Sequence, residues 1–186
     1  AHDAEVMSGY FTSVMGIPPQ KVKVVLDAKG LKDDWIEVFE QWLPKQAGPH
    51  TTAYVYVAGR AVVDHETGAV SLLPYDATVS GSTRAFSLAR LQRALANAPV
   101  KQAVVMLDLS LEPSSGSDPA RVAQPQWISQ VANGEQERVM LLVGNSTLQE
   151  AQAYQPGQHG LFTYFLLKGL RGAADLDKNG SVLTGE

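Results

Sequence analysis

The order of apolar and polar residues predicts helices and strands that follow one another along the chain. In residues 4–15, apolar side chains recur at helical spacing, and Asp3 is placed to cap that helix. Residues 21–26 alternate between apolar and polar, which predicts a strand. A second helix is expected over residues 33–43, because acids open its first turn and Pro44 marks its end.

Two later runs are almost continuously apolar or β-branched, a pattern typical of strands buried on both faces. They occupy residues 52–58 and 102–107. Between them, a polar turn predicts a short hairpin back through residues 70–73. Ser87 then precedes a helical repeat of apolar residues and is expected to cap a helix that ends near Asn97.

The last third of the chain predicts one more strand and two helices. Residues 112–125 are rich in Ser, Pro and Gly and are expected to form a loop, followed by a short helix over residues 127–131. A strand is expected over residues 138–143 and a helix over residues 161–170. A polar tail at residues 172–186 ends the chain.

Strands that alternate with helices predict an α/β fold, with a mainly parallel sheet and helices on both faces. We expect residues 1–186 to form a single domain, since a chain of this length buries one sizeable core. The chain begins with a predicted helix, whereas domains of this kind normally begin with a strand. A first strand of the sheet is therefore expected to be missing from the chain.

Composition and charge narrow the function classes. Apolar residues make up 45% of the chain and charged residues 18%, with a net charge of −4, so neither a nucleic-acid groove nor a polybasic membrane patch is expected. No apolar run is long enough to span a membrane, and no signal peptide is visible. The chain has no cysteine, which excludes disulfides, a thiolate nucleophile and zinc–thiolate sites.

Several segments, in order along the chain, resemble bacterial caspase-like peptidases of the peptidase C14 or metacaspase-like family. Residues 58–61 read Ala-Gly-Arg-Ala where that family usually reads Ser/Ala-Gly-His-Gly around its catalytic His. Residues 108–110 read Asp-Leu-Ser where the family has Asp-x-Cys, with the Cys as nucleophile. Residues 160–172 resemble the helix that follows the active-site strands. The resemblance implies a caspase-like (caspase–hemoglobinase) fold, and it leaves open whether the compartment is the bacterial cytoplasm or the periplasm.

At the positions that the resemblance makes catalytic, the chain has Arg60 and Ser110. A guanidinium stays protonated and cannot act as a base, and a hydroxyl needs stronger activation than a thiol to attack an amide. Ala61 replaces the glycine after the His, and the residues after Ser110 include Glu112 and then a proline, which removes a backbone donor. We therefore expect no catalytic residue and a vestigial pocket formed by Asp108, Ala61 and Glu112.

The residues alone leave open the partner of Arg60, the role of Asp108 and the identity of any base for Ser110. Arg60 is expected to pair with Asp108 or with Glu112. The resemblance implies that Asp108 is an acid that binds basic peptide side chains; the competing and favoured reading makes it the partner of Arg60. A further alternative is a relocated base for Ser110, supplied by one of the loop histidines His65, His50 and His159, and it is less favoured because lone loop histidines are usually solvated.

The tail contains a sequence that fits a calcium-binding loop of the EF-hand type in full. Its oxygen ligands would come from the side chains and carbonyl of five residues: Asp175, Asp177, Asn179, Ser181 and Glu186. Gly180 would make the sharp turn. The sequence places calcium binding and a plain turn on an equal footing.

These observations favour a catalytically inactive caspase-like domain that acts as a scaffold, a regulatory module or a peptide- or protein-binding module. The alternative is a residual hydrolase of a cysteine-peptidase family that uses Ser110 as nucleophile. A protein or peptide partner is expected, and another segment or chain that completes the sheet is one form this partner can take.

Overall fold

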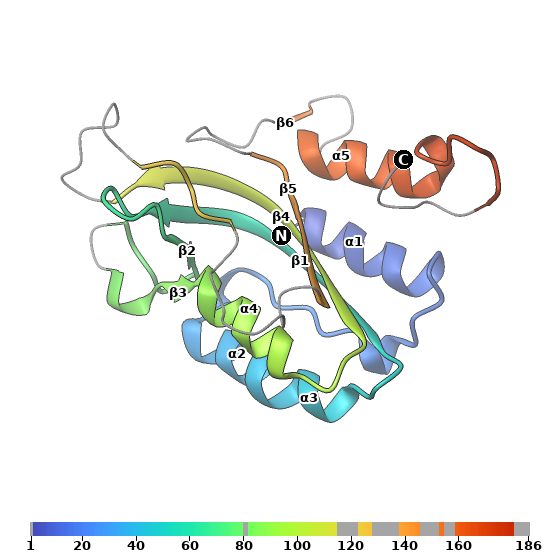
Figure 1. Cartoon of the computed structure of the whole chain (residues 1–186), viewed down its shortest axis with the longest axis horizontal. Helices are drawn as coiled ribbons and strands as arrows, with labels where there is room; N and C mark the ends of the chain where they lie inside the picture. Colours follow the sequence, from blue (N-terminus) through green and yellow to red (C-terminus); the bar gives the residue numbers. More distant parts are fainter. Residues whose placement is uncertain are drawn as a thin grey trace.

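The computed structural model describes residues 2–79, 82–114, 123–127, 138–145, 153–154 and 159–180 (Figure 1). A five-stranded sheet of order β3-β2-β1-β4-β5 forms its centre. β1, β4 and β5 are parallel, whereas β2 and β3 are antiparallel to their neighbours. The predicted α/β fold class is therefore confirmed. The strands are β1 (Thr52–Val63), β2 (Val70–Leu73), β3 (Phe86–Ser87), β4 (Gln102–Pro113), β5 (Val139–Val143), β6 (Ala153–Tyr154) and β7 (His159–Gly160), the last two pairing with each other.

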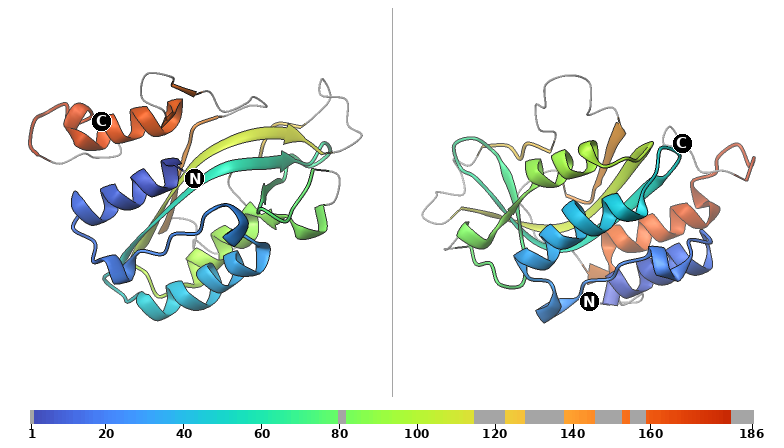
Figure 2. Two further views of the ribbon diagram at one scale, coloured as in Figure 1. Left: turned by 180° about the vertical axis from the view of Figure 1, so that it is seen from behind. Right: turned by 90° about the horizontal axis from the view of Figure 1, so that it is seen from below.

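Helices cover both faces of the sheet, as Figure 1 and Figure 2 show from three sides. The helical elements are α1 (His2–Ser13), η1 (Pro19–Lys21), η2 (Asp27–Lys29), α2 (Lys32–Ile36), η3 (Glu37–Trp42), α3 (Leu43–Gln46), η4 (Ser82–Arg84), α4 (Leu88–Asn97), α5 (Leu161–Lys168) and η8 (Gly169–Ala173). α1 and α5 lie on one face, and α2, α3 and α4 lie on the other. Among the described residues, no helix is long and apolar enough to cross a membrane.

Successive residues of β1 and β4 face opposite sides, which divides the interior into two apolar clusters. The larger cluster includes Val55, Val57, Val105 and Leu107, packed against α2, η3 and α4. The smaller one contains Met106 with side chains of α1 and α5. Arg60 and Ser110 face the same side of the sheet as Met106. The candidate site therefore lies on the face that is covered by α1 and α5.

Several sequence predictions agree with the structure. The hairpin back through Val70–Leu73 forms β2, and β5 covers Val139–Val143. The Ser87 hydroxyl accepts a hydrogen bond from the Arg90 N–H at 3.1 Å and caps α4. Residues 115–122 of the predicted loop and residues 128–131 of the predicted short helix lie outside the described residues.

Other predictions were wrong. Residues 22–26 are not a strand, because among the described residues no neighbouring strand pairs with them. Pro44 does not end the second helix, since the π-helical turn η3 leads into α3, which continues to Gln46. Asp3 lies inside α1 rather than capping it, and its carboxylate accepts a hydrogen bond from the Gly160 N–H instead.

The two long strands are longer than predicted. β1 and β4 each have 12 residues and pair along their whole length, from Thr52 opposite Gln102 to Val63 opposite Pro113. Glu112 was predicted to open a loop, yet it lies in β4 opposite Val62. The reason is that each strand provides the ladder that keeps the other extended, which the residues of one strand alone do not reveal.

Candidate active site

Arg60 and Ser110 are directly opposite each other in the parallel ladder of β1 and β4. Paired residues of neighbouring strands turn their side chains to the same face, so both side chains belong to the α1 side of the sheet. The two positions that the sequence singles out are therefore side by side. Both lie within the ladder rather than at strand ends, because each strand continues for three more residues.

The guanidinium of Arg60 pairs with Glu112, which is one of its two expected partners. Its Nε donates to Glu112 Oε1 at 2.7 Å. Glu112 lies two residues beyond Ser110 on the same strand face, so the Arg60 side chain passes along the strand to reach it. The hydrogen bond and the negative charge of Glu112 raise the pKa of Arg60 further above its ordinary value. A fixed cation therefore lies beside Ser110.

The ion pair contributes little to folding. The side chains of Arg60 and Glu112 are 57% and 35% exposed, so water screens their attraction. Pairs of this kind are worth about 0.2–1 kcal/mol. The effect of the pair is chemical, because it places a protonated group where a base would have to accept a proton from Ser110.

Asp108 is not the partner of Arg60, and this favoured reading was wrong. Its side chain is only 6% exposed, and its carboxylate accepts a hydrogen bond from the Thr163 hydroxyl at 2.6 Å. Because the Thr163 hydrogen is used in that bond, the Tyr56 hydroxyl donates to Thr163 Oγ1 at 2.5 Å. Tyr56, Thr163 and Asp108 thus form a buried chain of hydrogen bonds that ties both long strands to the first turn of α5.

Burial raises the pKa of the Asp108 carboxyl above its ordinary value. The hydrogen bond from Thr163 opposes that rise, and the negative charge of Asp3 adds to it. Burial also raises the pKa of Tyr56, which keeps its hydroxyl protonated and able to donate. A buried carboxylate that already accepts from Thr163 is poorly placed to bind a basic side chain from solvent.

Gly160 packs directly on this chain of hydrogen bonds. A Cβ at residue 160 would collide with the Asp108 carboxylate, so a residue with a side chain does not fit there. The Gly160 N–H also donates to Asp3 Oδ2 at 2.9 Å. α1, β4 and the start of α5 therefore meet at this point. The sequence did not predict that Tyr56 and Thr163 hydrogen-bond to each other and to Asp108. The signal that could have shown this was the hydroxyl of Thr163 within the mostly apolar residues 161–167.

Ala61 does not belong to the predicted pocket. It is fully buried in the larger core on the opposite face from Arg60, because neighbouring residues of a strand point to opposite sides. Glu112 does share the face of Arg60 and Ser110. Of the three pocket residues that were predicted, Glu112 alone contacts a candidate catalytic position, whereas Asp108 contacts Thr163.

The three candidate histidines lie at different places along the fold. His50 precedes β1, and the eight steps of strand from Thr52 to Arg60, at ~3.3 Å each, place it roughly 26 Å or more from the level of Arg60. His65 lies beyond the other end of β1, where its Nδ1 is 3.3 Å from Ser114 Oγ. His159 is in β7, next to the glycine that packs on Asp108. Because Asp108 is two residues before Ser110 in β4, His159 is the histidine that we select for mutation as a relocated base.

The predicted calcium loop is described only in part, since Ser181 and Glu186 lie outside the described residues. Gly180 has a φ of 82°, which agrees with the sharp turn expected there. The Asp175 carboxylate accepts from the N–H groups of Asn179 and Gly180, and that of Asp177 accepts from Asn179. Within the described residues, no group of three or more acidic or histidine side chains is gathered to hold a metal.

Comparison with known proteins agrees with the fold. The family model described as caspase domain matches residues 1–185. A search of curated proteins finds no match to the chain. The family model covers nearly the whole chain, and the mixed sheet with helices on both faces is consistent with it. The chain belongs to the caspase-domain family.

Proposed function

We propose that this chain is a catalytically inactive caspase-like domain, which acts as a scaffold, a regulatory module or a peptide- or protein-binding module. One observation supports this proposal above the others: Arg60 lies opposite Ser110 and is held as a cation by Glu112. A guanidinium keeps its proton near neutral pH, so Arg60 cannot accept the proton of Ser110 as a histidine base would. The chain also contains no cysteine to take over as nucleophile.

The backbone around the site supports the same conclusion. In β4, the residues after Ser110 stay extended and paired with β1 as far as Pro113. The ladder with β1 uses the peptide groups on one side of this strand, and Pro113 has no N–H to offer. The segment therefore has fewer backbone donors for a developing oxyanion.

Peptidase assays test the proposal directly. We expect no cleavage of fluorogenic peptides with Arg, Lys or Asp before the scissile bond, and no labelling of Ser110 by a fluorophosphonate probe. The matched control is Ser110→Ala, which removes the only candidate nucleophile and leaves the strand intact. Cleavage or labelling that is lost in both Ser110→Ala and His159→Ala would overturn the proposal and establish a serine hydrolase.

A binding module needs a partner, which we infer to be a protein or peptide. Calcium binding by the tail is a separate part of the proposal. Asp175 and Asp177 have carboxylate oxygens on the same short loop, and the turn at Gly180 has the geometry that such a loop requires.

A further inference from the structure

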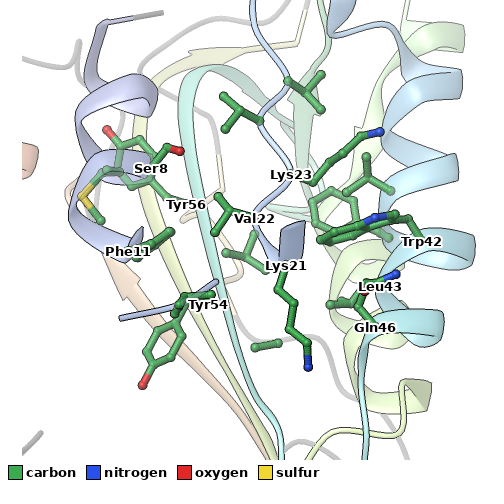
Figure 3. Close-up of a pocket in the computed structure, with 18 of the residues that line it drawn as sticks. Ser8, Phe11, Lys21, Val22, Lys23, Trp42, Leu43, Gln46, Tyr54 and Tyr56 are labelled. Atoms are coloured by element: carbon green, nitrogen blue, oxygen red, sulfur yellow. The ribbon is translucent and has the colours of Figure 1, made fainter. Parts of the chain in front are cut away.

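The loop that follows η8 contains an asparagine directly before a glycine, Asn179 and Gly180, beside two carboxylates. Figure 1 shows this loop in red, beyond the last helical element of the fold. Residues 176–180 are exposed, and none of them lines the groove of about 320 Å³ beside β1 that Figure 3 shows. The pair is therefore outside the packed interior and open to water.

An asparagine before a glycine is able to lose its side-chain amide without an enzyme. The backbone nitrogen of the glycine gives up its proton and forms a bond to the side-chain carbon Cγ of the asparagine. The amide group takes up a proton and leaves as ammonia, which closes a five-membered imide. Water then opens the imide at either carbonyl and leaves aspartate or isoaspartate. The attack is intramolecular, and glycine has no Cβ to obstruct its nitrogen.

Asp175 holds the nitrogen that would attack. Its carboxylate accepts hydrogen bonds from the N–H of Gly180 at 2.9 Å and from the N–H of Asn179 at 3.0 Å. Attack requires the Gly180 nitrogen to lose its proton, and the negative charge formed there would lie beside the Asp175 carboxylate. Like charges repel at this distance, so Asp175 disfavours the reactive form of the nitrogen.

Asp177 holds the group that would be attacked. The Asn179 Nδ2 donates to Asp177 Oδ2 at 2.8 Å, and the Asn179 N–H donates to Asp177 Oδ1 at 3.1 Å. Hydrogen bonds to a carboxylate are stronger than those between neutral groups. The side-chain amide is thus tied to Asp177 while the attacking nitrogen is tied to Asp175. Ring closure joins that nitrogen to Cγ, so we expect both ties to open first.

The shape of the loop explains why a glycine follows Asn179. Gly180 has a φ of 82°, in the left-handed region that disfavours residues with a side chain. This turn lets two successive N–H groups point at the one carboxylate of Asp175. The residue that makes the loop possible is therefore also the residue that leaves Asn179 open to attack.

We propose that Asn179 is a site of deamidation whose rate is controlled by Asp175 and Asp177. The reaction is slow while both carboxylates hold the pair, and local opening of the loop releases it. Each event consumes one water and releases one ammonia, and it needs no other reactant. The product has an additional negative charge at residue 179, next to the two carboxylates that held the amide.

The product alters the loop for which calcium binding is proposed. Aspartate at residue 179 still fits the calcium-loop pattern, which accepts Asp or Asn at that position. Isoaspartate adds a methylene group to the main chain and shifts Gly180 relative to the acids before it. This consequence rests on the proposed calcium binding, whereas deamidation itself does not, so each can fail alone.

The first experiment follows the unchanged protein near neutral pH and at physiological temperature, in a buffer that contains a calcium chelator. Peptide mapping by mass spectrometry measures the mass gain of deamidation at each asparagine. The reference is a synthetic peptide of residues 173–182. We expect the peptide to react at least about fivefold faster than the folded chain, because its carboxylates are not held in place. Mapping also separates Asn179 from Asn133, which precedes a glycine and lies outside the described residues.

Variants of Asp175 separate the effect of its charge from that of its hydrogen bonds. Asp175→Asn keeps an acceptor oxygen and removes the charge, so deamidation at Asn179 should be at least about twofold faster. Asp175→Ala removes the charge and both hydrogen bonds, and its rate should approach that of the peptide. Circular dichroism checks that each variant is folded.

Two further variants are controls. Asn179→Gln would have to close a six-membered ring, so we expect no mass gain at residue 179 on the same time scale. Glu66→Ala removes an exposed carboxylate that belongs to the turn after β1, and its Asn179 should react at the rate of the unchanged protein.

Three results would overturn the proposal. The first is equal rates in the folded chain and the peptide, since the hydrogen bonds would then have no effect. The second is equal rates in the unchanged chain and in both Asp175 variants. The third is no mass gain at Asn179 in Asp175→Ala while the peptide reacts, because another part of the fold would then protect the pair.

Discussion

Replacing Thr163 with valine tests the buried chain of hydrogen bonds beneath α5. Thr163 is fully buried, donates to Asp108 and accepts from Tyr56. Valine has nearly the same shape and lacks the hydroxyl, so both partners lose a hydrogen bond without a large cavity. A hydrogen bond to a charged group contributes about 1.5–3 kcal/mol, and an unsatisfied buried partner costs about 1–3 kcal/mol.

Because these two costs share one hydroxyl, they are not fully additive, and we expect Thr163→Val to lower the free energy of unfolding by about 2–4 kcal/mol near neutral pH. That is a large part of the stability of a typical domain, about 5–15 kcal/mol. Thr163→Ser keeps the hydroxyl and loses one buried methyl group, so it should cost about 1 kcal/mol.

The loss should also depend on pH. Burial raises the pKa of Asp108 in the folded state, so the native chain binds more protons than the unfolded chain between the two pKa values. Stability from this group is therefore highest below the unfolded pKa and decreases as the pH rises through the folded pKa. Thr163→Val removes the donor that favours the carboxylate, which raises the pKa of Asp108 further and makes the loss greater at neutral than at acidic pH.

Urea unfolding followed by circular dichroism, at about pH 7 and about pH 4.5, measures these differences for the unchanged chain and both variants. In a chain that carries Asp108→Asn, which removes the titrating group, Thr163→Val should cost the same at both pH values. A loss below about 1 kcal/mol in Thr163→Val at neutral pH, or a loss equal to that of Thr163→Ser, would refute the reasoning.

Three further predictions concern other parts of the chain. Gly160→Ala should destabilise the fold by about 1–3 kcal/mol in thermal or urea unfolding, because the new Cβ meets the buried Asp108 carboxylate. Gly9→Ala is the control, since open space surrounds Gly9 in α1, and it should stabilise the fold by up to about 1 kcal/mol. Equal effects of the two substitutions would contradict this prediction. Ser110→Cys should show no peptidase activity, because Arg60 still occupies the position of the base, and measurable cleavage by this variant would prove the expectation wrong. Calorimetry with Ca²⁺ should give a binding heat that Asp175→Ala abolishes, and no heat from the intact chain would remove calcium from the proposal.

Much of the fold follows from the periodicity of the sequence. The apolar runs around Val55 and Val105 predict two strands, and Ser87 predicts the start of α4; the structure has all three. The expected burial on both faces does not hold for β1, since Tyr54 is 37% exposed. Strand alternation also explains why Ala61 faces the larger core while Arg60 does not. This part was available from the sequence, since it depends only on the spacing of neighbouring residues.

The local spacing of residues did not predict the lengths of β1 and β4 or the hydrogen-bond partners of Arg60 and Asp108. Asp108 and Thr163 are 55 residues apart, and Arg60 and Glu112 are 52 apart, so neither contact leaves a local signal. Both depend on how β1, β4 and α5 are placed in space. The segment at residues 22–26 shows the same limit, because an extended chain becomes a strand only when a neighbour pairs with it.

The sequence by itself determined the family, the order of most elements and the loss of a cysteine nucleophile, because residue identities and their local spacing are enough for these. The tertiary structure alone decided that Arg60 turns to Glu112, that Asp108 is buried beneath α5, and that residues 22–26 are extended without forming a strand. These features arise from the register and packing of segments far apart in the chain, which the sequence of any one segment does not specify.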